Sequence, residues 1–309
     1  MDLPPEQTLR WIVRVYAEVR IAQRTTIEHP PLVQPDGEFF PDEFHHDVPS
    51  LERLLGRMAG YAPIGRHVGF DIGLLEAEGE ACGAGGSCGC SHDHSAGERS
   101  GRVEASPQGY RVWLRPQDAG RPEALTTVFA RAIGSVVLQQ AAAEADDRRS
   151  EIAAVACGFG VLLMNGAAIW GKSCGGLRMT RATVLTVEEL AVALALFGEL
   201  HGVRSSWSRK HLGATQRAAL TLAHDWAESN PMLVEALRDR PGVLEGGMFD
   251  VEPVRGMIGR WLYKRQLARE LKPVPAVPSD NSMTEDKKRR LREARALVDE
   301  VMGASDSEE

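Results

Sequence analysis

The chain has 309 residues, of which 43% are hydrophobic and 26% charged, and its formal net charge is −7. This content of apolar side chains excludes a chain that is disordered throughout, and it suffices for one large core or two modest ones. Because the charge is acidic overall and aromatic residues make up only 6%, we exclude a broad basic surface and expect no nucleic-acid partner.

The distribution of apolar residues favours a cytoplasmic protein that does not contact a membrane. Charges interrupt the N-terminal segment from Glu6 onward, so it lacks the apolar core of a signal peptide. The longest apolar runs, such as AVALALF at 191–197, fall short of the roughly 20 residues that span a membrane. In the cytoplasm, the five cysteines are more typical of thiols or metal ligands than of disulfides.

The first part of the chain combines helical and strand-like patterns. Apolar residues at helical spacing predict a helix over 5–26, which a Pro-Pro pair would end. A turn-rich aromatic segment follows, and a second helix is expected from Ser50, whose hydroxyl suits an N-cap. Strand-like runs near 66–76 and 108–115 predict a small sheet.

Between these two runs, residues 76–106 form a predicted loop insertion rich in glycine. Soft thiolates and imidazoles suit Zn²⁺, Cu(I) or Ni²⁺, and a glycine-rich chain can wrap around such an ion. The spacing differs from the paired C-x(2–4)-C of structural zinc sites, so two interpretations stay open: a soft-metal site and an incidental low-complexity insertion. The candidate metal ligands are Cys82, Cys88, Cys90, His92 and His94.

Helical patterns dominate the rest of the chain. A helix is predicted over 122–143, with a proline in its first turn, and an almost wholly apolar helix over 150–170. Further helices follow, and Thr186 with Glu189 fits a capping box at the start of one of them.

These elements predict an α+β fold, mostly helical, in which a small β-sheet packs on the helix pair just described. Residues 1–205 are expected to form one α+β domain that contains the loop insertion, and 206–271 a helical C-terminal region. Residues 272–309 are predicted to be a Pro-rich linker and a charged tail helix, over 279–303, that is separable from the main body.

Two short motifs in this order carry a resemblance to a known family. QPDGEFFPDEF at 34–44 is followed, after the strands and the 122–143 helix, by CGFGVLLMN at 157–165. The arrangement resembles a bacterial family of small zincin-like zinc metallopeptidases, in which a PT-x-x-FFP segment, an H-E-x-x-H helix and a GFG helix follow one another. The resemblance spans roughly residues 32–200, and it implies that the first domain is zincin-like.

The chain lacks the H-E-x-x-H motif that this resemblance implies on the 122–143 helix. In that motif two imidazoles, one helical turn apart, hold Zn²⁺, and the glutamate activates the bound water. Here Arg131 and Ala132 replace the first histidine and the glutamate, and Ser135 replaces the second histidine. Glu151 stands where an acidic ligand is expected, although a carboxylate near a helix N-terminus also has a structural interpretation. We therefore expect no zinc at this helix.

The remaining histidines do not form a catalytic or metal-ligating pattern. His45 and His46 are adjacent in sequence, so their side chains point apart. His201, His211 and His224 lie on separate helical pieces at spacings that do not match a ligand set, and we expect them to be structural or exposed.

Two further segments have structural interpretations. WGKSCGG at 170–176 lacks the spacing of a phosphate-binding P-loop, and we expect a glycine-rich turn between helices there. Cys157 lies inside an apolar run, which indicates a buried, inert thiol.

Three functions follow as hypotheses. The favoured one is a catalytically inactive zincin-like protein that is not an enzyme and acts as a scaffold or protein-interaction component, with an unidentified protein partner. Its contact surfaces would be the tail helix and a cavity left by the lost metal. The second is a metal-binding or metal-sensing protein that acts through the loop from Cys82 to His94. The third is an active enzyme with an unrecognised site.

Overall fold

The computed structural model of the chain describes residues 2–23, 30–64, 68–75, 100–107, 109–173 and 176–256. The chain divides into two units, 1–260 and 261–309, and every described residue belongs to the first unit. The predicted linker and tail helix in 272–309 lie outside the described residues, as do residues 76–99 of the loop insertion.

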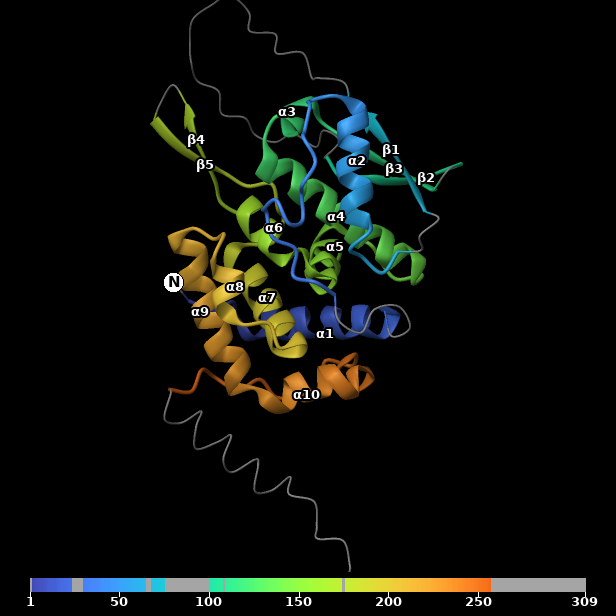
Figure 1. The fold of residues 1–309 in the computed structure, drawn as a ribbon. Coiled ribbons are helices and arrows are strands. Elements are labelled where there is room, and N and C mark those ends of the chain that lie inside the picture. The colour runs from blue at the N-terminus through green and yellow to red at the C-terminus, as the bar shows by residue number, and fades with distance from the viewer. Residues whose placement is uncertain are drawn as a thin grey trace, which may run out of the picture. The chain divides into compact units, whose positions relative to one another are not determined.

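The described part has an α+β fold that is mostly helical, as the sequence predicted (Figure 1). The helices are α1 (Glu6–Gln23), α2 (Val48–Ala59), α3 (Pro116–Ala119), α4 (Pro122–Gln140), α5 (Asp147–Ala154), α6 (Gly160–Gly166), α7 (Val187–His201), α8 (Ser205–Arg209), α9 (Ala214–Ser229) and α10 (Pro231–Asp239), with a π-helical turn η1 (Val155–Phe159) and a 3-10 turn η2 (Pro241–Leu244). The strands are β1 (Gly69–Leu74), β2 (Val103–Ser106), β3 (Gly109–Leu114), β4 (Ile169–Ser173) and β5 (Gly176–Thr180).

The predicted small sheet is present, and it has three strands in the order β1-β3-β2. The central strand β3 runs parallel to β1 and antiparallel to β2. Val112 and Leu114 of β3 are fully buried, and the strand packs against α4. Strand β2, at Val103–Ser106, lies within the range predicted to be loop insertion, so the insertion ends earlier than expected. Four residues of alternating polarity are too short a pattern to identify from sequence.

The helix pair α4 and α5 forms the centre of the core (Figure 1). A Cβ atom added at Gly134 of α4 would lie 2.0 Å from the carbonyl oxygen of Ser150 in α5, so the two backbones touch there. The same continuous core includes Leu220 and Trp226 of α9, which packs on α7. The predicted boundary after residue 205 therefore does not separate two cores in the described part.

The predicted helix over 150–170 is broken in the middle and ends early. It comprises α5, η1 and α6, and Gly158 inside η1 has a φ of +96°, which glycine adopts readily. A Cβ at Gly158 would lie 2.0 Å from the carbonyl oxygen of Pro31, and the carbonyl oxygen of Gly158 accepts a hydrogen bond of 3.0 Å from the Val33 amide. This close crossing requires glycine and brings the segment before Pro35 onto the helix pair.

Two helix starts test the predicted caps. The capping box of Thr186 and Glu189 is present at the start of α7, as predicted. The predicted N-cap Ser50 lies inside α2 instead, because Asp47 takes that role and its carboxylate accepts the Ser50 amide at 2.9 Å.

The predicted glycine-rich turn at 170–176 is part of a β-hairpin. Strands β4 and β5 pair antiparallel, with Trp170 opposite Met179. The side chains of Trp170 and Met179 are both exposed. Across the described ranges, we find no helix with the length and apolar character needed to cross a membrane.

Candidate functional site

The candidate metal ligands of the loop fall outside the described residues, so the structure does not place them: Cys82, Cys88, Cys90, His92 and His94. Within the described ranges, no group of three or more histidine, cysteine, aspartate or glutamate side chains is arranged to hold a metal ion. The positions that the resemblance assigns to a zinc site contain a different arrangement, which is built around Arg131.

Arg131 projects from α4 into the interior and forms an ion pair with Glu151 of α5. The Arg131 Nη1 atom lies 3.3 Å from Glu151 Oε1, and the two side chains are 6% and 0% exposed. Nη1 also donates to the carbonyl oxygen of Ala182 at 3.0 Å, and Nη2 donates to the carbonyl oxygen of Ser100. The guanidinium thus ties α4 to α5 and to two distant segments of the chain.

The Glu151 carboxylate is anchored by backbone amides as well as by Arg131. Its Oε1 accepts a hydrogen bond from the Val184 amide and its Oε2 one from the Leu185 amide, both at 2.8 Å. Burial raises the pKa of Glu151 because desolvation disfavours the charged form, and the positive charge of Arg131 and the two amide hydrogen bonds oppose that rise. The pair therefore joins the helix core to the segment that leads into α7.

The other two positions that the resemblance assigns to the motif are Ala132 and Ser135. Ala132 is fully buried in the core, and Ser135 accepts a hydrogen bond from the Gln139 amide group at 3.2 Å. The guanidinium of Arg131 lies where the resemblance implies a metal. Arginine is long enough to reach the Ser100 and Ala182 carbonyls from α4.

The described histidines are spread over the molecule. His46 is exposed and packs edge-on against Phe44. The Nε2 atom of His211 lies 3.4 Å from an Asp36 carboxylate oxygen. The Nδ1 atom of His224 lies 3.8 Å from the Glu199 carboxylate. The structure therefore does not bring these histidines together.

Cys157 is buried, as the sequence predicted. Desolvation raises the pKa of its thiol to about 12, and Gln23 donates a hydrogen bond to its sulfur at 3.2 Å. A thiol with such a pKa carries almost no thiolate at neutral pH, which makes it a poor nucleophile.

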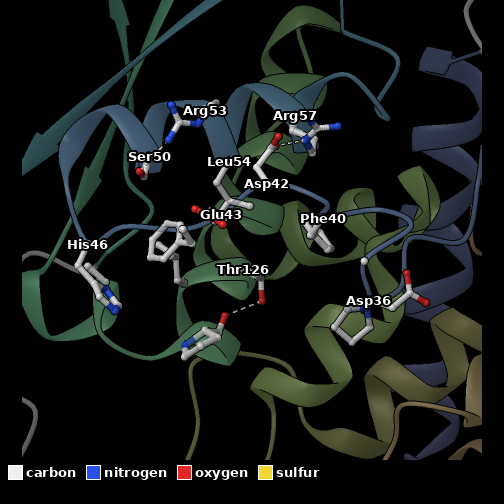
Figure 2. A pocket seen from close by; sticks show the side chains of 16 residues that line it. Asp36, Phe40, Asp42, Glu43, His46, Ser50, Arg53, Leu54, Arg57 and Thr126 are labelled. Atoms are coloured by element: carbon white, nitrogen blue, oxygen red, sulfur yellow. Dashed lines mark hydrogen bonds and ion pairs between the residues drawn. The ribbon is translucent and has the colours of Figure 1, made fainter.

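The structure also shows a cavity of about 420 Å³ that the sequence reasoning missed (Figure 2). Residues 35–46, helix α2 and the first turn of α4 enclose it. Its volume lies within the range of roughly 300–1,000 Å³ that is typical of ligand sites. The apolar part of its wall comprises Pro35, Phe40, Phe44, Leu54, Pro122 and Leu125.

Several contacts hold the wall formed by residues 35–46 in place. The Arg57 Nε atom of α2 donates to the Asp42 carboxylate at 2.6 Å. The Tyr61 hydroxyl donates to the Phe39 carbonyl oxygen at 2.9 Å, and the two rings pack edge-on. Asp36 closes a turn by accepting hydrogen bonds from two following amides. The cavity is therefore preformed rather than dependent on a ligand.

A sequence signal for this cavity existed in the segment EFFPDEF, which interleaves aromatic and acidic residues directly before an amphipathic helix. On that helix Arg53 and Arg57 are four residues apart and so lie on one face. We interpreted the segment as turn-rich and as part of the family resemblance, and not as a cavity wall, because its position opposite the start of α4 cannot be read from local pattern.

Comparison of the chain with protein-family models, with curated proteins and with solved structures gave no match. The function must therefore be argued from the described residues themselves.

Proposed function

We propose that the chain is a catalytically inactive zincin-like protein that acts as a scaffold or protein-interaction component. The observation that supports this most is the buried pair of Arg131 and Glu151 at the positions that the resemblance assigns to metal ligands. A fixed positive charge at that place repels a metal cation, and no side chain there replaces the two imidazoles.

Hydrolysis of a peptide bond by this route needs a metal that lowers the pKa of bound water and a carboxylate that takes its proton. Ala132 offers no base. The Glu151 carboxylate already accepts hydrogen bonds from two backbone amides and from the Arg131 guanidinium, so both of its oxygens have structural partners. Arginine and glutamate in these positions therefore favour stability of the helix pair over catalysis.

Metal analysis of the purified chain tests the proposal that the protein is catalytically inactive. The chain is prepared without a metal-chelating tag, both intact and with residues 80–98 deleted, so that zinc held by the loop is counted separately. We expect fewer than about 0.1 zinc ions per chain in the deleted form, and no digestion of labelled casein by either form. One zinc ion per chain in the deleted form, or casein cleavage that a chelator abolishes, would refute the proposal.

Zinc bound only by the intact chain would instead support the second hypothesis, a metal-binding role for the loop. Soft thiolate and imidazole ligands would explain such binding. In that case the candidate ligands Cys82, Cys88, Cys90, His92 and His94 are the residues to replace next.

The zincin-like part of the proposal has a separate test. Positions 131 and 135 are one helical turn apart, and Glu151 lies beside the first of them. The double change Arg131→His and Ser135→His should therefore gain about one zinc ion per chain, with Glu151 as a third ligand. Each single change is the matched control and should gain none, and a double variant that is folded yet free of zinc would count against the zincin-like assignment.

An unidentified protein partner in the cytoplasm completes the proposal. A pull-down with the full chain and with residues 272–309 deleted tests whether that segment contributes to the contact. Loss of a stoichiometric partner on deletion would assign the contact to the segment.

A further inference from the structure

The cavity beside α2 has the composition of a recognition site and plays no part in the arrangement around Arg131. Aromatic and aliphatic side chains supply much of its wall, and the charged side chains of Asp36, Asp42, Glu43, Arg53 and Arg57 also line it (Figure 2). Phe44 of the lining is 37% exposed, and residues 41–49 are all exposed. A ligand can therefore reach the apolar wall without any rearrangement of the chain.

The charged side chains of the cavity differ in whether they already have a partner. Asp42 is paired with Arg57 at 2.6 Å. Asp36 lies 4.0 Å from the Lys210 amine and 3.4 Å from His211. By contrast, the Glu43 carboxylate has no hydrogen bond or ion pair with any residue in the described ranges. The acidic group that remains for a ligand is thus Glu43.

Arg53 is the remaining basic group of the lining, and it is already engaged with α2. Its Nη2 atom donates to the Ser50 hydroxyl at 2.9 Å, and both residues belong to α2 (Figure 2). The protein as a whole carries a formal charge of −7, which attracts cations and repels anions over distance. A hydrogen bond to a hydroxyl leaves the charge of Arg53 in place, but the lining has three carboxylates (Asp36, Asp42 and Glu43) against two guanidinium groups (Arg53 and Arg57). Both the lining and the overall charge therefore favour a cationic ligand over an anionic one.

We propose that this cavity binds a basic segment of a partner protein in which an aromatic or large aliphatic side chain neighbours a lysine or arginine. The apolar side chain enters between Phe44, Leu54 and Leu125, and the cation pairs with Glu43. This inference rests on the proposed function, since it names the surface of an inactive scaffold that holds its partner. Aromatic anchors in preformed pockets carry most of the binding energy in such interfaces.

The test uses labelled peptides and the full chain. The probe is fluorescein-Gly-Lys-Phe-Lys-Leu-Gly, and fluorescence anisotropy measures its affinity at physiological salt. One matched peptide has glutamate for both lysines, and another has alanine for phenylalanine and leucine. We expect the lysine–phenylalanine peptide to bind at least about tenfold more tightly than either matched peptide. It alone has both a lysine that can pair with Glu43 and apolar side chains that can contact the apolar wall.

Four variants assign the binding to the cavity. Glu43→Gln should weaken the affinity for the probe about three- to fivefold, which is the effect expected for loss of an exposed ion pair. Phe44→Ala should weaken it about tenfold. Arg53→Gln should not weaken it, because that change removes a like charge. Glu38→Gln is the matched control, since Glu38 is exposed in the same segment but does not line the cavity.

The outcomes separate this inference from the proposed function. The assignment of the cavity is overturned if the probe fails to bind at about 1 mM, or if the glutamate peptide binds more tightly. Neither result bears on the proposal that the protein is an inactive scaffold. An equal loss in Glu38→Gln and Glu43→Gln would overturn it too, since that would show a diffuse attraction to an acidic surface. Cleavage of the bound probe, detected by mass spectrometry, would support the site and refute the proposed function.

Discussion

Replacing Arg131 with methionine should destabilise the protein by about 3–5 kcal/mol at neutral pH, because it leaves a buried carboxylate without its counter-ion. Methionine has a similar length and keeps the apolar packing, so the change removes mainly the charge and the donors. The fully buried Glu151 would retain only its two amide hydrogen bonds of 2.8 Å. The Ser100 and Ala182 carbonyls would also lose a donor.

The loss of stability in Arg131→Met should depend on pH, because it leaves Glu151 without its ion pair. Burial already raises the pKa of Glu151 in the folded chain, and removing Arg131 takes away a cause that lowers it. The folded variant therefore binds a proton more readily than the unfolded chain does at pH values above the ordinary carboxyl pKa, and its stability falls as pH rises. The difference between wild type and variant should narrow as pH is lowered from 7.5 towards 5, by up to about 1.4 kcal/mol per pH unit.

Urea unfolding followed by tryptophan fluorescence at pH 7.5, 6.5 and 5.5 measures this effect, since Trp226 is buried in the same core. Arg14→Met is the matched control. Arg14 lies 3.7 Å from Glu18 in a half-buried pair, and Glu18 keeps Arg149 as a second partner, so the loss of this pair should cost less than about 1 kcal/mol. The reasoning is refuted if Arg131→Met costs no more than this control, or if its cost is the same at all three pH values.

Three further predictions test the packing, a cap and the buried thiol. Gly134→Ala should cost about 2–3 kcal/mol in urea unfolding, because its Cβ would overlap the Ser150 carbonyl oxygen, whereas Gly56→Ala, with open space around it, should gain about 0.5–1 kcal/mol; equal effects would contradict the close contact of α4 and α5. Thr186→Ala should lower stability by about 1 kcal/mol through loss of the capping box, and an unchanged unfolding midpoint would count against it. Cys157 should resist iodoacetamide at pH 8 until the chain is unfolded, as peptide mass mapping can show; labelling of the native chain would contradict its burial.

Local sequence patterns were sufficient to predict the class of fold and most of the helices. Apolar periodicity located α1 and α4, and the short-range chemistry of Thr186 and Glu189 marked the start of α7. The sequence alone also identifies position 131 as an arginine and position 132 as an alanine. Such features depend on residues a few positions apart, and a single sequence contains all of that information.

Tertiary structure decided the features that depend on distant segments. The carbonyl oxygens of Ser100 and Ala182 come from opposite sides of α4 in the sequence, and only folding brings them to Arg131. Gly158 breaks its helix because Pro31, 127 positions away, passes too close for any side chain. The cavity likewise forms between a short exposed segment and two helices that no periodicity relates. In each case the deciding contact joins residues far apart in the chain, and local pattern carries no record of that contact.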